Sequence, residues 1–80
     1  MVRVPFAFRI DEVSSDTAAT NMIASYVERG EPVYALRQAN GEIWLLVGAF
    51  ESTEQASLYA PSLRASGVAP VLVYRTGRPF

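Results

Sequence analysis

Phe6-Ala-Phe-Arg-Ile10 and Ile43-Trp-Leu-Leu-Val47 open two copies of one sequence pattern. In each copy the apolar run leads to a serine, an alanine and a glycine at the same spacing. The two copies are offset by 37 residues throughout, and the equivalent pairs are Ser15 and Ser52, Ala19 and Ala56, and Gly30 and Gly67. The pattern predicts a strand followed by a helix that starts at a serine and ends at a glycine.

A second apolar run completes each copy, Pro32-Val-Tyr-Ala-Leu36 in the first and Pro70-Val-Leu-Val-Tyr74 in the second. Each copy is therefore a βαβ unit, and the chain is βαββαβ. We expect an α+β fold of the ferredoxin or RNP-like type, with a four-stranded antiparallel sheet of order 4-1-3-2 and both helices on one face. The Asn40-Gly41 pair is typical of a hairpin between the second and third strands.

The expected helices differ in one residue that matters for their shape. Ser52-Thr-Glu-Gln55 has the spacing of a capping box, whereas the first helix starts at Ser14 or Ser15. Pro61 lies inside the second helix, where it removes a backbone donor and clashes with the preceding turn. We expect a kink or a break within one turn of Ala60.

Alternation along the strands assigns their side chains to two faces. The helix-covered face should hold Phe6, Phe8, Ile10, Tyr34, Leu36, Ile43, Leu45, Val47, Val71 and Val73. The opposite face should hold Ala7, Arg9, Ala35, Arg37, Trp44, Leu46, Leu72 and Tyr74. This second face is unusually apolar for a surface in water, which indicates a ligand or a partner.

Composition limits the class of function. We interpret the 80 residues as one domain, with a core from about residue 5 to 75, and as part of a longer protein. Seven arginines and eight acidic residues give a net charge of −1. This charge provides no electrostatic attraction to nucleic acid, so we expect no nucleic-acid partner. The chain has no cysteine, histidine or lysine, so we expect no catalysis, cofactor or metal. No apolar run approaches the roughly 20 residues of a membrane span, so we expect no membrane contact by this segment.

The second half of the chain resembles a known family. The run from Gly41 to Ala56, with Val47-Gly-Ala-Phe50 and its following serine, and then Leu63-Arg-Ala-Ser-Gly67, is similar to a SPOR domain. The resemblance implies the βαββαβ fold and binding to peptidoglycan glycan strands without stem peptides, often at bacterial division sites. It also implies a periplasmic or cell-envelope location, with a targeting segment outside this chain, although a cytoplasmic location stays open.

The resemblance also implies a site on the open sheet face. The family's binding positions fall on Arg9, Glu12, Glu42, Trp44 and Leu72, of which only Leu72 keeps the residue type. From the residues themselves, the Trp44 ring could stack on a sugar, and Arg9 and Arg37 could donate hydrogen bonds to it. Glu12 and Glu42 oppose an anionic ligand. The candidate site residues are Arg9, Glu12, Arg37, Glu42, Trp44, Leu46, Leu72 and Tyr74.

Two alternatives to glycan binding stay open. The same apolar face could pack against a protein partner or a second copy of the chain, because aromatic residues and arginine are enriched in interfaces. An RNA-recognition motif shares the topology, but it needs stacking aromatics on both central strands. Phe6 and Phe8 are expected in the core, so RNA binding ranks below the other two.

Overall fold

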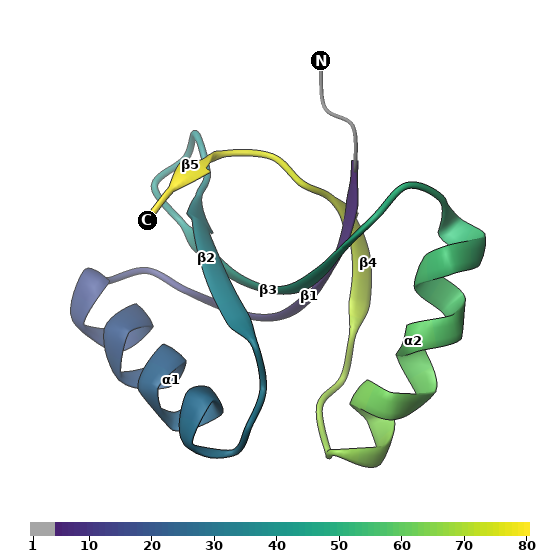
Figure 1. The fold of residues 1–80 in the computed structure, drawn as a ribbon. Helices are drawn as coiled ribbons and strands as arrows, with labels where there is room; N and C mark the ends of the chain where they lie inside the picture. The colour runs from purple at the N-terminus through teal and green to yellow at the C-terminus, as the bar shows by residue number, and fades with distance from the viewer. Residues whose placement is uncertain (1–4) are drawn as a thin grey trace.

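The fold is an α+β sandwich of one sheet and two helices, and the computed structural model describes residues 5–80 (Figure 1). The elements are β1 (Phe6–Val13), α1 (Asp16–Glu28), β2 (Val33–Arg37), β3 (Ile43–Phe50), α2 (Thr53–Ala65), β4 (Val71–Tyr74) and β5 (Arg78–Pro79). The antiparallel sheet has the order β4-β1-β3-β2-β5. The predicted order 4-1-3-2 is confirmed, and the short strand β5, which the sequence does not predict, extends the sheet beyond β2.

The internal repeat is visible in the structure. β1 and β3 have equivalent bounds in the two copies, and so do α1 and α2. Both helices are capped in the same way, because Ser15 Oγ accepts from the Ala18 N–H and Ser52 Oγ accepts from the Gln55 N–H. The C-terminal ends of the two helices are joined by a hydrogen bond from Arg29 to the Ser66 carbonyl, at 3.0 Å.

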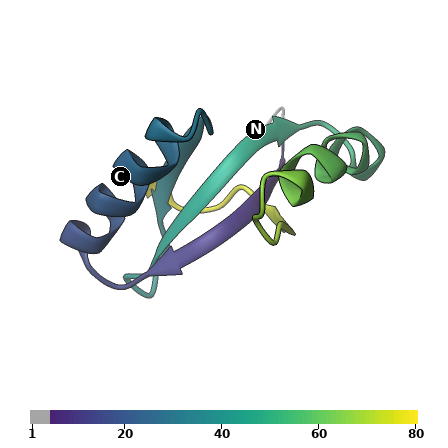
Figure 2. The ribbon, with the colours of Figure 1, turned by 90° about the horizontal axis from the view of Figure 1, so that it is seen from below.

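The two helices lie over separate parts of the sheet (Figures 1 and 2). The core accordingly has two parts, one under each helix. The fully buried Ala19 lets α1 approach β2 and β3, and the equivalent Ala56 lets α2 approach β1 and β3. The part under α2 contains Phe8, Val47, Ala56, Ala60, Leu63 and Val68, and the part under α1 contains Ala19, Ala35, Ile43 and Leu45. Ile10, Tyr26 and Val33 pack against both parts and join them.

The predicted register of β2 is wrong by one residue. Ala35 pairs with Leu45 and Arg37 with Ile43, so these residues lie on the helix-covered face. Tyr34 and Leu36 pair with Leu46 and Trp44 and lie on the opposite face. Ala35 is small enough to fit under α1. Arg37 emerges where α1 begins, and its Nη2 lies 2.8 Å from Asp16 Oδ1.

The register of β4 differs from prediction by the same single residue. Leu72 pairs with Phe8 and Tyr74 with Phe6, so both lie on the side of the helices. The Tyr74 ring stacks on Phe6 at 5.2 Å between centroids. Val71 and Val73 lie on the other side. The predicted position of Trp44, away from the helices, is confirmed by its pairing with Leu36 and Glu12.

Pro61 does not break the second helix. α2 runs without interruption from Thr53 to Ala65 with Pro61 inside it. Both Pro61 and Ser57, whose carbonyl would accept from position 61, are exposed. The carbonyl that lacks its helical donor can therefore accept a hydrogen bond from water, which reduces the destabilisation that the proline causes.

Within the described residues, no helix is long and apolar enough to cross a membrane.

Candidate ligand-binding site

The site begins with a stacked pair on the sheet face that the helices leave uncovered. The Arg9 guanidinium lies over the Trp44 ring, with 5.0 Å between Cζ and the ring centroid. Arg9 Nη1 also lies 3.8 Å from Glu12 Oε2. A guanidinium is planar, and its contacts with the Trp44 ring and the Glu12 carboxylate restrict its orientation, so the directions of its N–H groups are largely set before a ligand arrives.

A β-bulge brings Arg9 and Glu12 together. In a regular strand, residues three apart point to opposite faces. Here Arg9 pairs with Leu46 while Asp11 pairs with the adjacent Leu45, so Ile10 is an extra residue in β1. The bulge shifts the alternation by one position. Glu12 consequently lies opposite Trp44 and shares a face with Arg9.

A shallow hollow continues the site at the end of the sheet. It has a volume of about 210 Å³ and is lined by Glu12, Val13, Ser14 and Glu42. With Arg9 beside it, this surface carries one positive and two negative charges. It offers planar N–H donors next to carboxylate acceptors, an arrangement that matches hydroxyl groups, since a hydroxyl both donates and accepts.

The centre of this sheet face is covered by the chain itself. Ala7 and Leu46 are both 0% exposed, although they lie on the side away from the helices. The segment that leaves β4 crosses the sheet to reach β5, and Arg75 at its start lies over the Tyr34 ring at 5.7 Å. Leu46, a predicted site residue, is therefore inaccessible to a ligand in this structure.

Tyr34 is held firmly in this covered region. Its hydroxyl donates to the Gly48 carbonyl at 2.6 Å. Burial raises the pKa of Tyr34 above its ordinary value of 10.0, and the positive charge of Arg75 opposes that rise. The tyrosine is thus a neutral hydrogen-bond donor that fixes β2 to β3.

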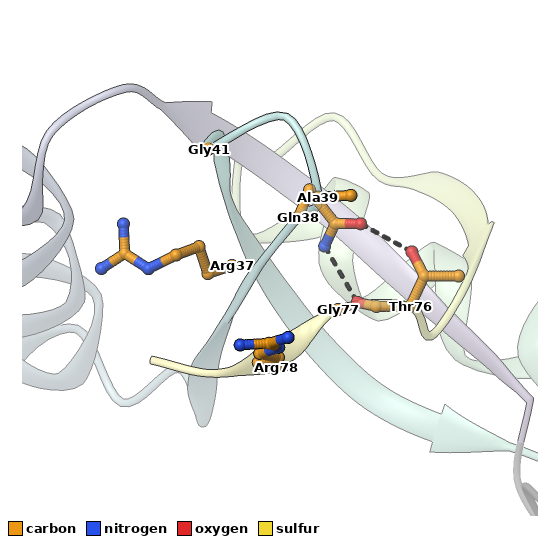
Figure 3. A pocket seen from close by; sticks show the side chains of 7 residues that line it. All are labelled: Arg37, Gln38, Ala39, Gly41, Thr76, Gly77 and Arg78. Carbon is orange, nitrogen blue, oxygen red and sulfur yellow. Dashed lines mark hydrogen bonds between the residues drawn. The ribbon is translucent and has the colours of Figure 1, made fainter.

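A second and larger hollow lies between the β2–β3 hairpin and the end of the chain (Figure 3). Its volume is about 770 Å³, and Arg37 and Arg78 line it. Gln38 and Thr76 hold its two sides together. The Gln38 amide donates to the Thr76 carbonyl at 2.9 Å, and the Thr76 hydroxyl donates to the Gln38 side-chain oxygen at 2.6 Å.

The two arginines of this hollow differ in their partners. Arg37 is paired with Asp16, and its Cζ lies 5.6 Å from the Phe80 ring. Arg78 is exposed and makes no ion pair or side-chain hydrogen bond with residues 5–80. The hollow is therefore positively charged, in contrast to the acidic hollow at Glu12 and Glu42. Gly41 lines the larger, positively charged hollow and the adjacent Glu42 lines the smaller, acidic one, so the hairpin separates them.

The structure divides the predicted site residues into three groups. Arg9, Glu12 and Trp44 come together, with Glu42 at the rim. Leu46 lies on the same face as the cross-strand partner of Arg9 and is fully buried. The remaining three predicted residues lie on the helix side because of the register changes in β2 and β4, and they are Arg37, Leu72 and Tyr74.

The functional residues that the sequence does not predict follow from two causes. The change of register in β2 places Tyr34 and Leu36 on the open face, and the unexpected strand β5 brings in the chain that precedes it. The missed residues of the larger hollow and the covered face include Tyr34, Leu36, Gln38, Arg75, Thr76 and Arg78. Arg78-Pro79 is too short for a strand signal, so only the pairing with β2 reveals it.

No metal site is suggested by the acidic residues. Within residues 5–80, no three carboxylates gather in a way that could hold an ion.

Comparison of the chain with protein-family models, with curated proteins and with solved structures gave no match. The geometry of Arg9, Trp44 and the two hollows is therefore what indicates a function.

Proposed function

We propose that this domain is a non-catalytic binding module that holds a saccharide strand against Arg9, Glu12 and Glu42. The observation that carries the proposal is the Arg9 guanidinium, stacked over Trp44 at 5.0 Å and set beside the Glu12 carboxylate at 3.8 Å. The resemblance to SPOR domains supports a peptidoglycan glycan strand without stem peptides as the ligand. It also supports a place for the protein in the bacterial cell envelope.

The physical basis is the pairing of fixed donors with fixed acceptors. A sugar hydroxyl can accept from an Arg9 N–H while it donates to Glu12 or Glu42. Because Trp44 orients the guanidinium, less side-chain freedom is lost on binding. The apolar ring of Trp44 also excludes water from one side of these hydrogen bonds, which strengthens them.

Charge suggests how a peptide-free strand would lie. Removal of the stem peptide leaves a carboxylate on the lactyl group of every second sugar. Glu12 and Glu42 repel such a group, whereas Arg78, in the hollow on the other side of the hairpin, attracts it. The proposed strand therefore crosses the hairpin near Gly41, with hydroxyls toward Arg9 and a carboxylate toward Arg78.

The protein-interface alternative has little support on this face. It requires a continuous apolar surface of Trp44, Leu46, Leu72 and Tyr74. Leu46 is covered by the chain, and Leu72 and Tyr74 lie on the side of the helices. Little apolar surface is left around Trp44 to anchor a partner there.

Sedimentation with peptidoglycan tests the proposal. The chain should sediment with amidase-treated peptidoglycan and less with intact peptidoglycan. Arg9→Ala should reduce the bound fraction several-fold at limiting ligand, because the oriented donors are lost. Arg64→Ala is the matched control, since Arg64 is an exposed arginine on α2, far in the fold from this site, and should leave binding unchanged.

A second variant separates charge from hydroxyl recognition. Arg78→Ala should weaken binding to the peptide-free strand but not to a neutral oligomer of N-acetylglucosamine. Absence of binding to either saccharide, by a folded wild-type chain, contradicts the proposal. Equal losses with Arg9→Ala and Arg64→Ala contradict the assigned site and indicate only a general effect of positive charge.

A further inference from the structure

The segment Arg75-Thr-Gly-Arg-Pro-Phe80, which we call the strap, crosses the sheet face that the helices leave uncovered (Figure 1). Ala7 and Leu46 lie on that face and are both 0% exposed. The start of the strap lies over the ring of Tyr34, the cross-strand partner of Leu46, because Arg75 Cζ is 5.7 Å from the ring centroid. The rest of the strap is itself exposed. A buried apolar floor therefore lies under a segment that buries little of its own surface.

The far end of the strap is held by short contacts with β2 and the hairpin. The two residues of β5 pair with β2, but Pro79 has no N–H to donate to that pairing. The Phe80 N–H donates to the Ala35 carbonyl at 3.3 Å, which is long for such a bond. The hydrogen bonds between Gln38 and Thr76 are exposed to water. Segments held by exposed contacts of this kind open at a lower free energy than the core does.

From these contacts we propose that the strap opens as a unit while the rest of the domain stays folded, and that its opening extends the saccharide site. Leu46 pairs with Arg9, so the uncovered floor continues directly from the Arg9–Trp44 pair. It would take the apolar face of a further sugar ring, which gains by leaving water. What the strap gates rests on the proposed function, whereas its opening does not.

Gly77 determines how closely the strap can approach β2. Its φ is +102°, and a Cβ at this position would meet the Arg37 carbonyl oxygen and lie 2.8 Å from Gln38 Nε2. Gly77→Ala should therefore favour the open strap. Gly67→Ala is the matched control, because Gly67 has a φ of +91° but an added Cβ there meets nothing within 4 Å. The control keeps the backbone strain and lacks the contact with β2.

Thiol labelling measures the opening, because the chain contains no cysteine of its own. Leu45 and Leu46 are adjacent in β3 and both 0% exposed, but Leu45 lies in the core under α1 and Leu46 on the face that the strap crosses. Leu46→Cys should react at least about tenfold faster than Leu45→Cys, since only the latter needs the core to open. Dilute urea should hardly change the rate of Leu46→Cys, but it should accelerate Leu45→Cys with the slope of global unfolding. Equal rates with equal urea dependence overturn the proposal.

The glycine variants identify the strap as the element that opens. Gly77→Ala, added to Leu46→Cys, should raise the labelling rate without urea by about fivefold or more. Gly67→Ala in the same background should leave the rate within about twofold, because its strain lies outside the strap. An equal rise in both proteins overturns the proposal, since it indicates a general loss of stability.

Saccharide affinity tests what the strap gates. A neutral oligomer of N-acetylglucosamine is the probe, because its binding should not depend on the charge of Arg78. Gly77→Ala should bind it several-fold more tightly than the wild-type chain, because a larger fraction of the protein is open before binding. Unchanged affinity together with faster labelling overturns the gating. Absence of binding by both proteins contradicts the proposed function and the gating together, whereas labelling of Leu46→Cys without urea dependence still establishes the opening.

Discussion

β2 and β4 are equivalent strands of the two copies, yet they end in different surroundings. β2 pairs with β3 on one side and β5 on the other, whereas β4 pairs with β1 alone among the described residues. The Gln38–Thr76 hydrogen bonds hold the chain against the β2 side. The duplication therefore repeats the elements and their caps, but one copy has an enclosed strand and the other an edge. The proposed saccharide site lies at the hairpin of the enclosed strand.

The largest expected effect on stability is that of a substitution at Ala35, compared with the same substitution at Leu72, the equivalent residue of the second copy. Ala35 is buried under α1, and Leu72 is 38% exposed on the edge strand. Ala35→Lys should lower the free energy of unfolding by roughly 3 kcal/mol, because it overfills the core and buries an unpaired charge. Leu72→Lys should change it by less than about 0.5 kcal/mol. Urea unfolding of dilute, monomeric protein measures both, and equal effects would contradict the assigned register.

An effect of intermediate size on stability is expected from exchanging proline and alanine between equivalent positions of the two helices. Pro61 in α2 is equivalent to Ala24 in α1, and both side chains are exposed. Pro61→Ala should raise the free energy of unfolding by about 1–3 kcal/mol, because it restores a helical donor without changing the core. The reverse exchange in the other copy, Ala24→Pro, should lower it by a similar or larger amount. Thermal unfolding followed by circular dichroism tests the pair, and a less stable Pro61→Ala protein would show that the proline is required.

The smallest expected effect concerns pH and Tyr34. Burial raises the pKa of Tyr34 in the folded protein above its unfolded value of 10.0. A raised pKa gives stability that is fully present below pH 10 and is lost as the pH rises from there through the folded pKa. The free energy of unfolding should therefore fall above pH 10. The fall should be smaller in Tyr34→Phe, compared with Tyr59→Phe as a control, and equal slopes in both variants would contradict the assignment.

The sequence predicts the architecture better than it predicts which face of the sheet each strand residue occupies. The helix caps at Ser15 and Ser52 and the strand order follow from local signals, and the structure agrees with them. The predicted registers of β2 and β4 are wrong because nearly all their residues are apolar, so period-two alternation carries no information there. Ala35 fits under a helix because it is small, which a hydrophobic pattern does not detect.

The candidate site is predictable only where its residues belong to β1 and β3. The structure brings Arg9, Glu12 and Trp44 together on one face, but the bulge at Ile10 that aligns Arg9 with Glu12 has no sequence signal. The covering of Leu46 has no such signal either. It depends on the route of the chain from β4 to β5, which is set by a two-residue pairing and by the side-chain hydrogen bonds of Gln38.

If a saccharide binds beside Arg9 and Trp44 as proposed, the indole N–H of Trp44 should report it. Trp44 is the only tryptophan of the chain, and its Nε1 is buried without a hydrogen-bond partner among the described residues. In a ¹⁵N-labelled protein, titration with peptide-free glycan fragments should shift this resonance saturably, together with the amides of Arg9, Glu12 and Glu42. A titration that leaves these signals in place while the glycan binds elsewhere, or not at all, would contradict the proposed site.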